Sequence, residues 1–227
     1  CYCLYSINLE NIYYKLMSKN DLEQNKIINS LIKADKDLGK FIKFFEKENF
    51  KILDDYKKKS DFLSLVRIIV GQQLSISSAA SIYNRFIEYY GEEIDYLDGK
   101  SSEQKMKDMG FSRTKAKTVI EVSKLIKDKK LNLSLTSKLS EKEAKDVLCK
   151  IKGIGPWTVE NFLIFSGNNK DICPANDLGL KKGIKKIYNL DKLPSDDEVY
   201  SISENWRPYR SVAVRYIWEI VDQDINF

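Results

Sequence analysis

One short stretch of the sequence combines residue types that suit a phosphate-binding turn. Residues 151–158 read IKGIGPWT, with two glycines that permit a tight turn and a close backbone approach. The proline suits the first turn of a following helix, whose free N–H groups and positive dipole end would face the phosphate. A plain helical hairpin with a glycine turn has the same pattern. The candidate contacts are Lys152, Gly153, Ile154, Gly155 and Thr158.

A single carboxylate about twenty residues later is the second candidate. Asp177 follows Pro174-Ala175-Asn176, a position from which it can cap a helix and still direct its carboxylate into a cleft. A helix cap alone would also explain this residue. The chain has no histidine, which excludes Ser-His-Asp and Cys-His catalysis. Any catalysis must therefore use carboxylates, lysines, tyrosines or backbone dipoles.

The cysteines do not indicate a metal cluster. They occur at positions 1, 3, 149 and 173 and form no CxxC pair, so neither a zinc site nor an iron–sulfur cluster is expected.

The distribution of charge favours an anionic partner more than the net charge of +5 does. Nine lysines and arginines stand against four acidic residues between Glu103 and Lys130. Seven lysines stand against three acidic residues from Lys150 to Leu190. Each stretch contains a glycine turn: residues 151–158 lie in the second, and Met109 to Ala116 resembles a looser hairpin of similar build in the first. Two basic stretches of this kind favour nucleic acid over a membrane or an acidic protein.

The elements that must position these residues are helices. Apolar residues recur with helical spacing, no long alternating stretch competes, and all four prolines stand near expected helix starts. Asp61, Ser75 or Ser77, and the pair Ser140 and Glu143 provide cap signals. The expected helices cover residues 21–34, 38–47, 61–70, 76–90, 102–109, 113–128, 141–150, 156–166, 177–188, 195–204 and 208–220.

Length and composition predict a globular chain. The 227 residues, 43% of them hydrophobic and 31% charged, fit one large domain or two small ones packed together. No apolar run reaches the length of a membrane span, so no membrane association is expected. The first residues lack the basic leader and cleavage site of a secretory signal, and we expect none. Residues 1–30 are expected to form an N-terminal arm.

Several segments together resemble a known family. The stretch from Leu148 to Leu180, with IKGIGPWTVENFLIF and CPANDLGL, resembles the helix-hairpin-helix, Gly/Pro-rich loop and aspartate signature of base-excision DNA glycosylases. The segments 66–86, 110–119 and 206–220 are similar to the 3-methyladenine DNA glycosylase II branch of that superfamily. The resemblance covers about residues 30 to 222. It implies an all-α fold of two helical lobes with the active cleft between them.

The resemblance assigns a role to the acidic candidate. The matching aspartate of the family is catalytic, so Asp177 is the expected catalytic residue. Cleavage of an N-glycosidic bond builds positive charge on the sugar, and a fixed carboxylate stabilises that charge before water attacks. An alkylated purine is already cationic and leaves easily, which reduces the need for a general acid.

The family match also indicates a base pocket. Trp157 and Trp218 match positions that line it, and an indole face attracts a flipped cationic base; core packing is the alternative for both. Asn161 stands where an aromatic residue or Met is common, which leaves the base selectivity open. Strand-cutting relatives have a lysine at the position of Trp157, so no lyase activity is expected.

Two further features follow from the resemblance. The GQQLS segment matches the minor-groove wedge, where Gln73 or Leu74 would fill the space left by the flipped base; a simple helix–helix turn is the alternative. A sodium or potassium ion is expected on the backbone carbonyls of Cys149, Ile151 and Gly153, and no cofactor is required.

The expected protein is a monofunctional DNA glycosylase that removes 3-methyladenine-type bases from double-stranded DNA in base-excision repair. It is expected to be a monomer, located inside the cell with genomic DNA. The hairpin lobe is expected at about residues 75–180, and the second lobe at 31–74 plus 181–222. A glycosylase for another damaged or mismatched base, or a non-catalytic DNA-binding module, are the alternatives.

Overall fold

The computed structural model describes residues 19–48, 60–97, 103–166 and 169–222. In these residues the fold is all-α, as expected. No described helix is both long and apolar enough to cross a bilayer. The helices are α2 (Lys19–Ala34), α3 (Lys36–Lys47), α4 (Asp61–Gly71), α5 (Ile76–Tyr90), α6 (Glu103–Asp108), α7 (Arg113–Lys127), α8 (Leu133–Thr136), α9 (Glu141–Leu148), α10 (Pro156–Phe165), α11 (Leu178–Ile187), α12 (Asp196–Ser203), the 3-10 turn η1 (Glu204–Trp206) and α13 (Arg210–Asp222).

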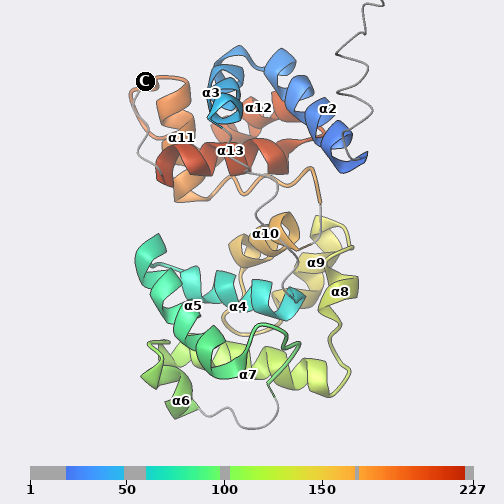
Figure 1. The fold of residues 1–227 in the computed structure, drawn as a ribbon, viewed down its shortest axis with the longest axis vertical. Helices are drawn as coiled ribbons and strands as arrows, with labels where there is room; N and C mark the ends of the chain where they lie inside the picture. The colour runs from blue at the N-terminus through green and yellow to red at the C-terminus, as the bar shows by residue number, and fades with distance from the viewer. Residues whose placement is uncertain (1–18, 49–59, 98–102, 167–168, 223–227) are drawn as a thin grey trace, which may run out of the picture.

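The helices form two lobes, one above the other in Figure 1. We call α4 to α10 the hairpin lobe, because its helices pack on one another and it contains residues 151–158. We call α2, α3, α11, α12, η1 and α13 the terminal lobe, since it combines the two ends of the described chain. The chain therefore enters the hairpin lobe once and returns to the terminal lobe once.

The central helix of the hairpin lobe is α4, and the expected lobe boundary differs from the structure here. We expected residues 31–74 in the second lobe, but α4 packs on α5, α7, α8 and α10. Leu63, Ile68 and Ile69 point in different directions around this helix and are all buried. A helix that is apolar on most of its circumference needs neighbours on most sides, which the hairpin lobe supplies; Ser64 and Arg67 lie on the remaining face.

Residues 19–30, which we counted in the N-terminal arm, form most of α2 and pack on α3, in agreement with the helix expected over residues 21–34. Ile27, Ile28 and Leu31 of α2 are buried. The first eighteen residues of that arm lie outside the described residues.

The helix starts follow the chemistry expected from the sequence. Ser75 caps α5, and Ser140 with Glu143 forms a capping box at α9. Pro156 stands in the first turn of α10. At α4 the cap is Ser60 rather than Asp61, which lies in the first turn and suits the positive end of the helix dipole there.

Candidate functional site

The carboxylate of Asp177 lies where the two lobes meet. It caps α11, and its Oδ1 accepts the backbone N–H of Leu180 at 2.6 Å. The same oxygen accepts the indole N–H of Trp218, from α13 of the terminal lobe, at 2.9 Å. Its Oδ2 accepts the indole N–H of Trp157, from α10 of the hairpin lobe, at 2.6 Å. One helix cap thus connects both lobes.

All three of these donors are uncharged. Among the residues that the structure describes, no lysine or arginine forms an ion pair with Asp177, whose side chain is partly exposed. Hydrogen bonds hold the carboxylate in place without cancelling its charge. A fixed, uncompensated and partly exposed carboxylate can stabilise positive charge that develops on a bound molecule.

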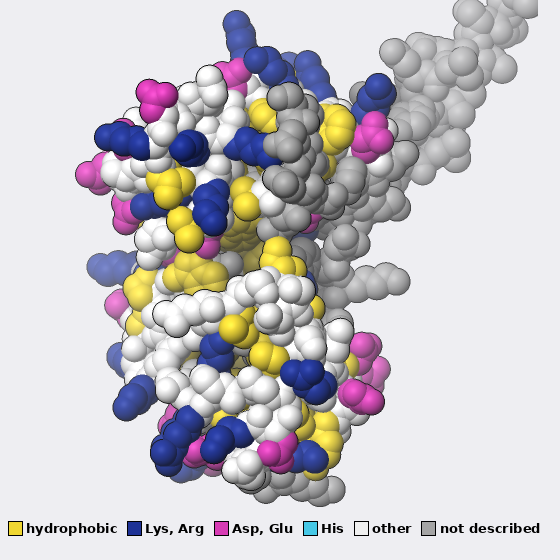
Figure 2. Space-filling view, turned by 90° about the vertical axis from the view of Figure 1, so that its left-hand side faces the viewer, with side chains coloured by type: hydrophobic (Ala, Val, Ile, Leu, Met, Phe, Trp, Pro, Cys, Tyr) yellow, Lys and Arg dark blue, Asp and Glu magenta, His cyan; other side chains and the backbone are white. Residues whose placement is uncertain are grey.

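The tryptophans form walls beside the carboxylate. The Trp218 ring stacks on Phe165 at a centroid distance of 5.6 Å and an interplanar angle of 26°. Gly179 leaves room for this arrangement, because a Cβ there would lie 3.1 Å from Asp177 Oδ1 and 3.3 Å from Trp218 Cδ1. Figure 2 shows apolar side chains gathered in the hollow between the lobes.

A second carboxylate close to this region does not face the hollow. Glu160 on α10 is only 4% exposed and bonds to Lys145 of α9 at 2.7 Å. Burial raises the pKa of Glu160, and the Lys145 ammonium opposes that change. The pair joins α9 to α10, whereas the Asp177 carboxylate is partly exposed and has no ion pair among the described residues.

Asn161 lies one turn after Trp157 on α10. Its Nδ2 donates to the Trp157 carbonyl at 2.9 Å, and its side chain is 5% exposed. Asn161 therefore lies behind the tryptophan, and contact with a base stays a prediction.

The hairpin of residues 151–158 has the expected tight turn. Gly153 has a φ of +95°, and a Cβ there would lie 2.1 Å from Thr118 Oγ1 of α7. Only glycine fits both this backbone conformation and this contact. Gly155 caps α10 without a side-chain hydrogen bond, which leaves the start of that helix open to an anion.

Two side chains of the hairpin differ from expectation. Ile154 is 5% exposed and belongs to the core, so only its backbone can reach a ligand. The Thr158 hydroxyl is buried as well and accepts a hydrogen bond from Gln72 Nε2 at 2.9 Å. Lys152 is exposed, as expected for a phosphate contact.

The turn of residues 71–75, which we call the wedge turn, presents both predicted wedge residues. Gln73 has a φ of +56°, and Leu74 is 41% exposed. Both side chains are exposed. Which of them fills the space of a flipped base stays a prediction.

Two residues that the sequence reasoning missed hold the wedge turn in place. Gln72 Nε2 donates to the Gly153 carbonyl at 3.1 Å as well as to Thr158. Lys115 Nζ donates to the carbonyls of Val70 and Gln72 at 2.9 and 2.7 Å, and burial lowers its pKa. The wedge turn and the hairpin therefore form one unit. The only sequence signal was the polar pair in GQQLS.

The second glycine turn lies between α6 and α7 of the hairpin lobe. Gly110 has a φ of +101°, and Arg85 Nε donates to the Met109 carbonyl at 2.8 Å. Ser112 then caps α7. The looser helix–turn–helix expected in the first basic stretch is present.

An all-α chain with this hairpin and a capped aspartate between two lobes has the architecture of a helix-hairpin-helix DNA-repair protein. The chain belongs to the HhH-GPD superfamily of base excision DNA repair proteins, whose family model matches residues 66–208. The resemblance expected from the sequence is confirmed.

Named relatives support this assignment. The chain is 34% identical over 215 residues to DNA-3-methyladenine glycosylase 1 of Schizosaccharomyces pombe, covering 87% of this chain and 90% of the relative. It is 32% identical over 173 residues to the putative DNA-3-methyladenine glycosylase YfjP of Bacillus subtilis, covering 70% of this chain but only 58% of that longer protein.

A solved structure has the same fold. The S. pombe 3-methyladenine DNA glycosylase Mag1, in complex with abasic DNA, superposes with a TM-score of 0.70 at 27% identity. The match covers 86% of this chain and 95% of Mag1.

Proposed function

We propose that this chain is a monofunctional DNA glycosylase that hydrolyses the N-glycosidic bond of 3-methyladenine-type purines in double-stranded DNA. The observation that carries the proposal is the Asp177 carboxylate, held by two indole N–H groups at the meeting of the lobes. The names of the relatives support the substrate class. The protein acts on genomic DNA as a monomer, in base-excision repair.

The reaction needs one carboxylate and one water molecule. When the bond between the sugar C1′ and the base nitrogen breaks, its electron pair leaves with the base and positive charge develops on the sugar. Asp177 Oδ2 accepts only the Trp157 bond, while Oδ1 accepts two; Oδ2 therefore has the greater free capacity to face the sugar. Water then attacks C1′ and gives up a proton.

The flipped base lies against the indole walls. A cationic purine over an indole face gains about 0.5–2 kcal/mol. Because both indole N–H groups are bound to Asp177, the orientation of the rings is fixed by the residue that acts on the sugar. Binding of the base and stabilisation of the sugar cation are thus coupled in one arrangement.

The hairpin and the wedge turn hold the DNA. The open start of α10 and Lys152 contact a phosphate near the lesion, and Gln73 or Leu74 fills the space of the flipped base. Gln72 bonds to the Gly153 carbonyl. Movement of the DNA strand bound at the hairpin is therefore transmitted to the wedge turn.

We also propose a sodium or potassium ion at the hairpin. The Ile151 carbonyl accepts the Ile154 N–H at 3.0 Å, and the Gly153 carbonyl accepts Gln72 at 3.1 Å. A carbonyl oxygen has two lone pairs, so both can still coordinate an ion together with the Cys149 carbonyl. The ion would add positive charge beside the phosphate.

The test is an excision assay on a panel of duplexes. The protein should release 3-methyladenine from methylated duplex DNA and should leave duplexes with 8-oxoguanine or a mismatch intact. Chromatography of the released bases measures this, with heat-inactivated protein as the blank. Release equal to the blank would favour the non-catalytic module, and release of only the oxidised or mismatched base would contradict the substrate class.

Borohydride treatment should trap no covalent adduct on abasic DNA. Strand cleavage through a Schiff base needs an amine that attacks C1′ at about 3 Å, and the residue in contact with Asp177 at that position is Trp157. Denaturing electrophoresis after reduction measures the adduct, with a lysine-dependent glycosylase as the positive control. A trapped band from this protein would overturn the monofunctional assignment.

Replacing Trp157 by Phe should slow excision about 10- to 100-fold, which corresponds to the loss of a hydrogen bond to a charged group. The aromatic wall stays, but the N–H that bonds to Asp177 Oδ2 is lost. Single-turnover kinetics on methylated duplex measures the rate.

Trp206→Phe is the matched control. Trp206 Nε1 donates to another helix cap, Asp35 Oδ2, at 3.0 Å inside the terminal lobe. This variant should lower the thermal midpoint and keep the excision rate. Equal loss of rate in both variants would mean that Trp157 acts only through stability.

A further inference from the structure

A groove of about 1140 Å³ lies on the hairpin lobe, between α7 on one side and α9 with the hairpin on the other. None of the site residues Asp177, Trp157 and Trp218 lines it. It collects basic residues from both basic stretches of the sequence. Arg113, Lys117 and Lys130 line it from the α7 side, and Lys150 and Lys152 from the hairpin side.

The charge in the groove is positive after local pairing. Glu103 and Glu121 are the acidic residues of the lining. Glu103 is already paired with Arg113 at 2.8 Å and lies 3.8 Å from Lys117, and Lys130 Nζ lies 3.9 Å from the Asp128 carboxylate. In the ranges that the structure describes, no carboxylate pairs with Lys150. The positive charge is therefore strongest along the hairpin side.

The floor of the groove is apolar. Ile120 and Leu125 of α7 and Val147 of α9 line it, and Val147 is 37% exposed. A cleft in which charges of one sign prevail and whose walls have a low dielectric constant concentrates the electric field. Lysines on the rim of such a cleft attract an anionic chain more strongly than lysines on an open surface.

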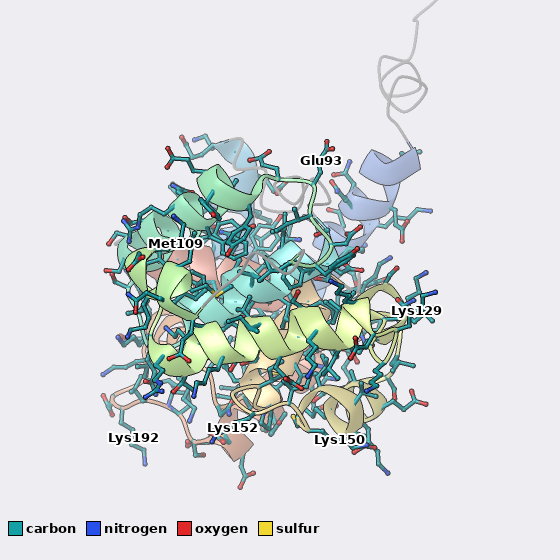
Figure 3. All side chains as sticks on the ribbon, turned by 90° about the horizontal axis from the view of Figure 1, so that it is seen from below. Glu93, Met109, Lys129, Lys150, Lys152 and Lys192 are labelled. Atoms are coloured by element: carbon teal, nitrogen blue, oxygen red, sulfur yellow. The ribbon has the colours of Figure 1, made fainter. Side chains whose placement is uncertain are left out.

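The groove continues from the hairpin that grips DNA in the proposed function. Thr118 Oγ1, on the groove wall, donates to the Lys152 carbonyl at 2.8 Å. Figure 3 looks onto α7 and shows Lys150 and Lys152 along one side of this helix, with Lys129 near its C-terminal end. Lys152, a phosphate contact in the proposed function, therefore belongs to both the hairpin and the groove.

We propose that this groove is a second DNA contact, which takes the sugar–phosphate backbone of duplex DNA that flanks the lesion. The inference rests on the proposed function. An acidic peptide also matches the charge, but continuity with the hairpin favours DNA. The contact extends the footprint of the protein and strengthens its hold on undamaged flanking sequence during the search for a lesion.

The test compares two duplex lengths. Fluorescence anisotropy measures affinity for duplexes of about 12 and about 30 base pairs with a central tetrahydrofuran abasic analogue, over a range of salt. The variant is Lys130→Glu with Lys150→Glu, both exposed residues. The matched control is Lys36→Glu with Lys43→Glu, which places the same charge change on exposed residues of α3.

The groove variant should bind the long duplex about tenfold or more weakly, with a salt slope smaller by about 2. Its affinity for the short duplex should fall much less, because that duplex has fewer flanking phosphates to follow the groove. Unchanged affinity for the long duplex, as expected for a peptide groove, would overturn the proposal. Equal losses on both duplexes would also overturn it. Failure of the proposed function would instead appear as absence of base release by the wild type.

Discussion

Asp177→Asn should reduce base release about 10³-fold or more, on the scale of losing a preorganised electrostatic group, while DNA affinity changes little. Asparagine is about as good a helix cap as aspartate, so α11 keeps its start. The amide oxygen can still accept Leu180 N–H and Trp218. The amide nitrogen then faces the Trp157 N–H, and the negative charge beside the sugar is gone.

The matched control for this variant is Asp35→Asn. Asp35 caps α3 and accepts an indole N–H from Trp206, as Asp177 does from its own tryptophans. It is only 6% exposed and lies inside the terminal lobe. This control should lose stability and keep excision activity. Single-turnover excision, thermal unfolding and anisotropy measure the three effects; full activity in Asp177→Asn would refute the catalytic assignment.

Asp177 and Asp35 have different roles that the local sequence around them does not predict. Both follow the helix-cap pattern, and local sequence cannot distinguish them. Their difference is tertiary, because one lies between lobes and the other within a lobe. The indoles that meet Asp177 are 20 and 41 residues away in the chain. Only the family resemblance placed them together in advance.

Local features of the fold were predicted well because they depend on neighbouring residues. Caps, proline positions and helical spacing decide where most helices begin and end. The four-residue helix α8 was not predicted, since one turn gives no periodicity to detect. The lobe assignment of α4 was wrong because we gave less weight to its largely apolar sequence than to its position in the chain.

Errors within the site have a different cause. Ile154 and Thr158 were taken as surface contacts because they belong to a glycine turn, but both side chains face inward. Gln72 and Lys115 were missed because they bond to groups 43 to 86 residues away. A side chain that donates a hydrogen bond to a distant backbone carbonyl leaves no periodic or local pattern in the sequence.

Gly153→Ala should weaken DNA binding more than any other single change in the hairpin. Alanine at a φ of +95° is strained, and its Cβ would lie 2.1 Å from Thr118 Oγ1. We expect an unfolding free energy lower by about 2–4 kcal/mol. Because Gln72 bonds to the Gly153 carbonyl, the wedge turn moves with the hairpin, and DNA affinity should fall at least about 100-fold as several phosphate contacts are lost.

Gly155→Ala should lower the affinity for DNA without lowering the stability of the protein. Gly155 has a φ of −109°, and a Cβ there meets nothing within 4 Å, so the unfolding free energy should change by less than about 0.5 kcal/mol. The methyl group would, however, stand at the open start of α10, where the phosphate approaches the backbone. Anisotropy should show DNA affinity reduced about tenfold in a fully stable protein, a loss of the size expected when a charged hydrogen bond is displaced. Normal affinity in this variant would place the phosphate elsewhere, and normal stability in Gly153→Ala would contradict the contact with Thr118.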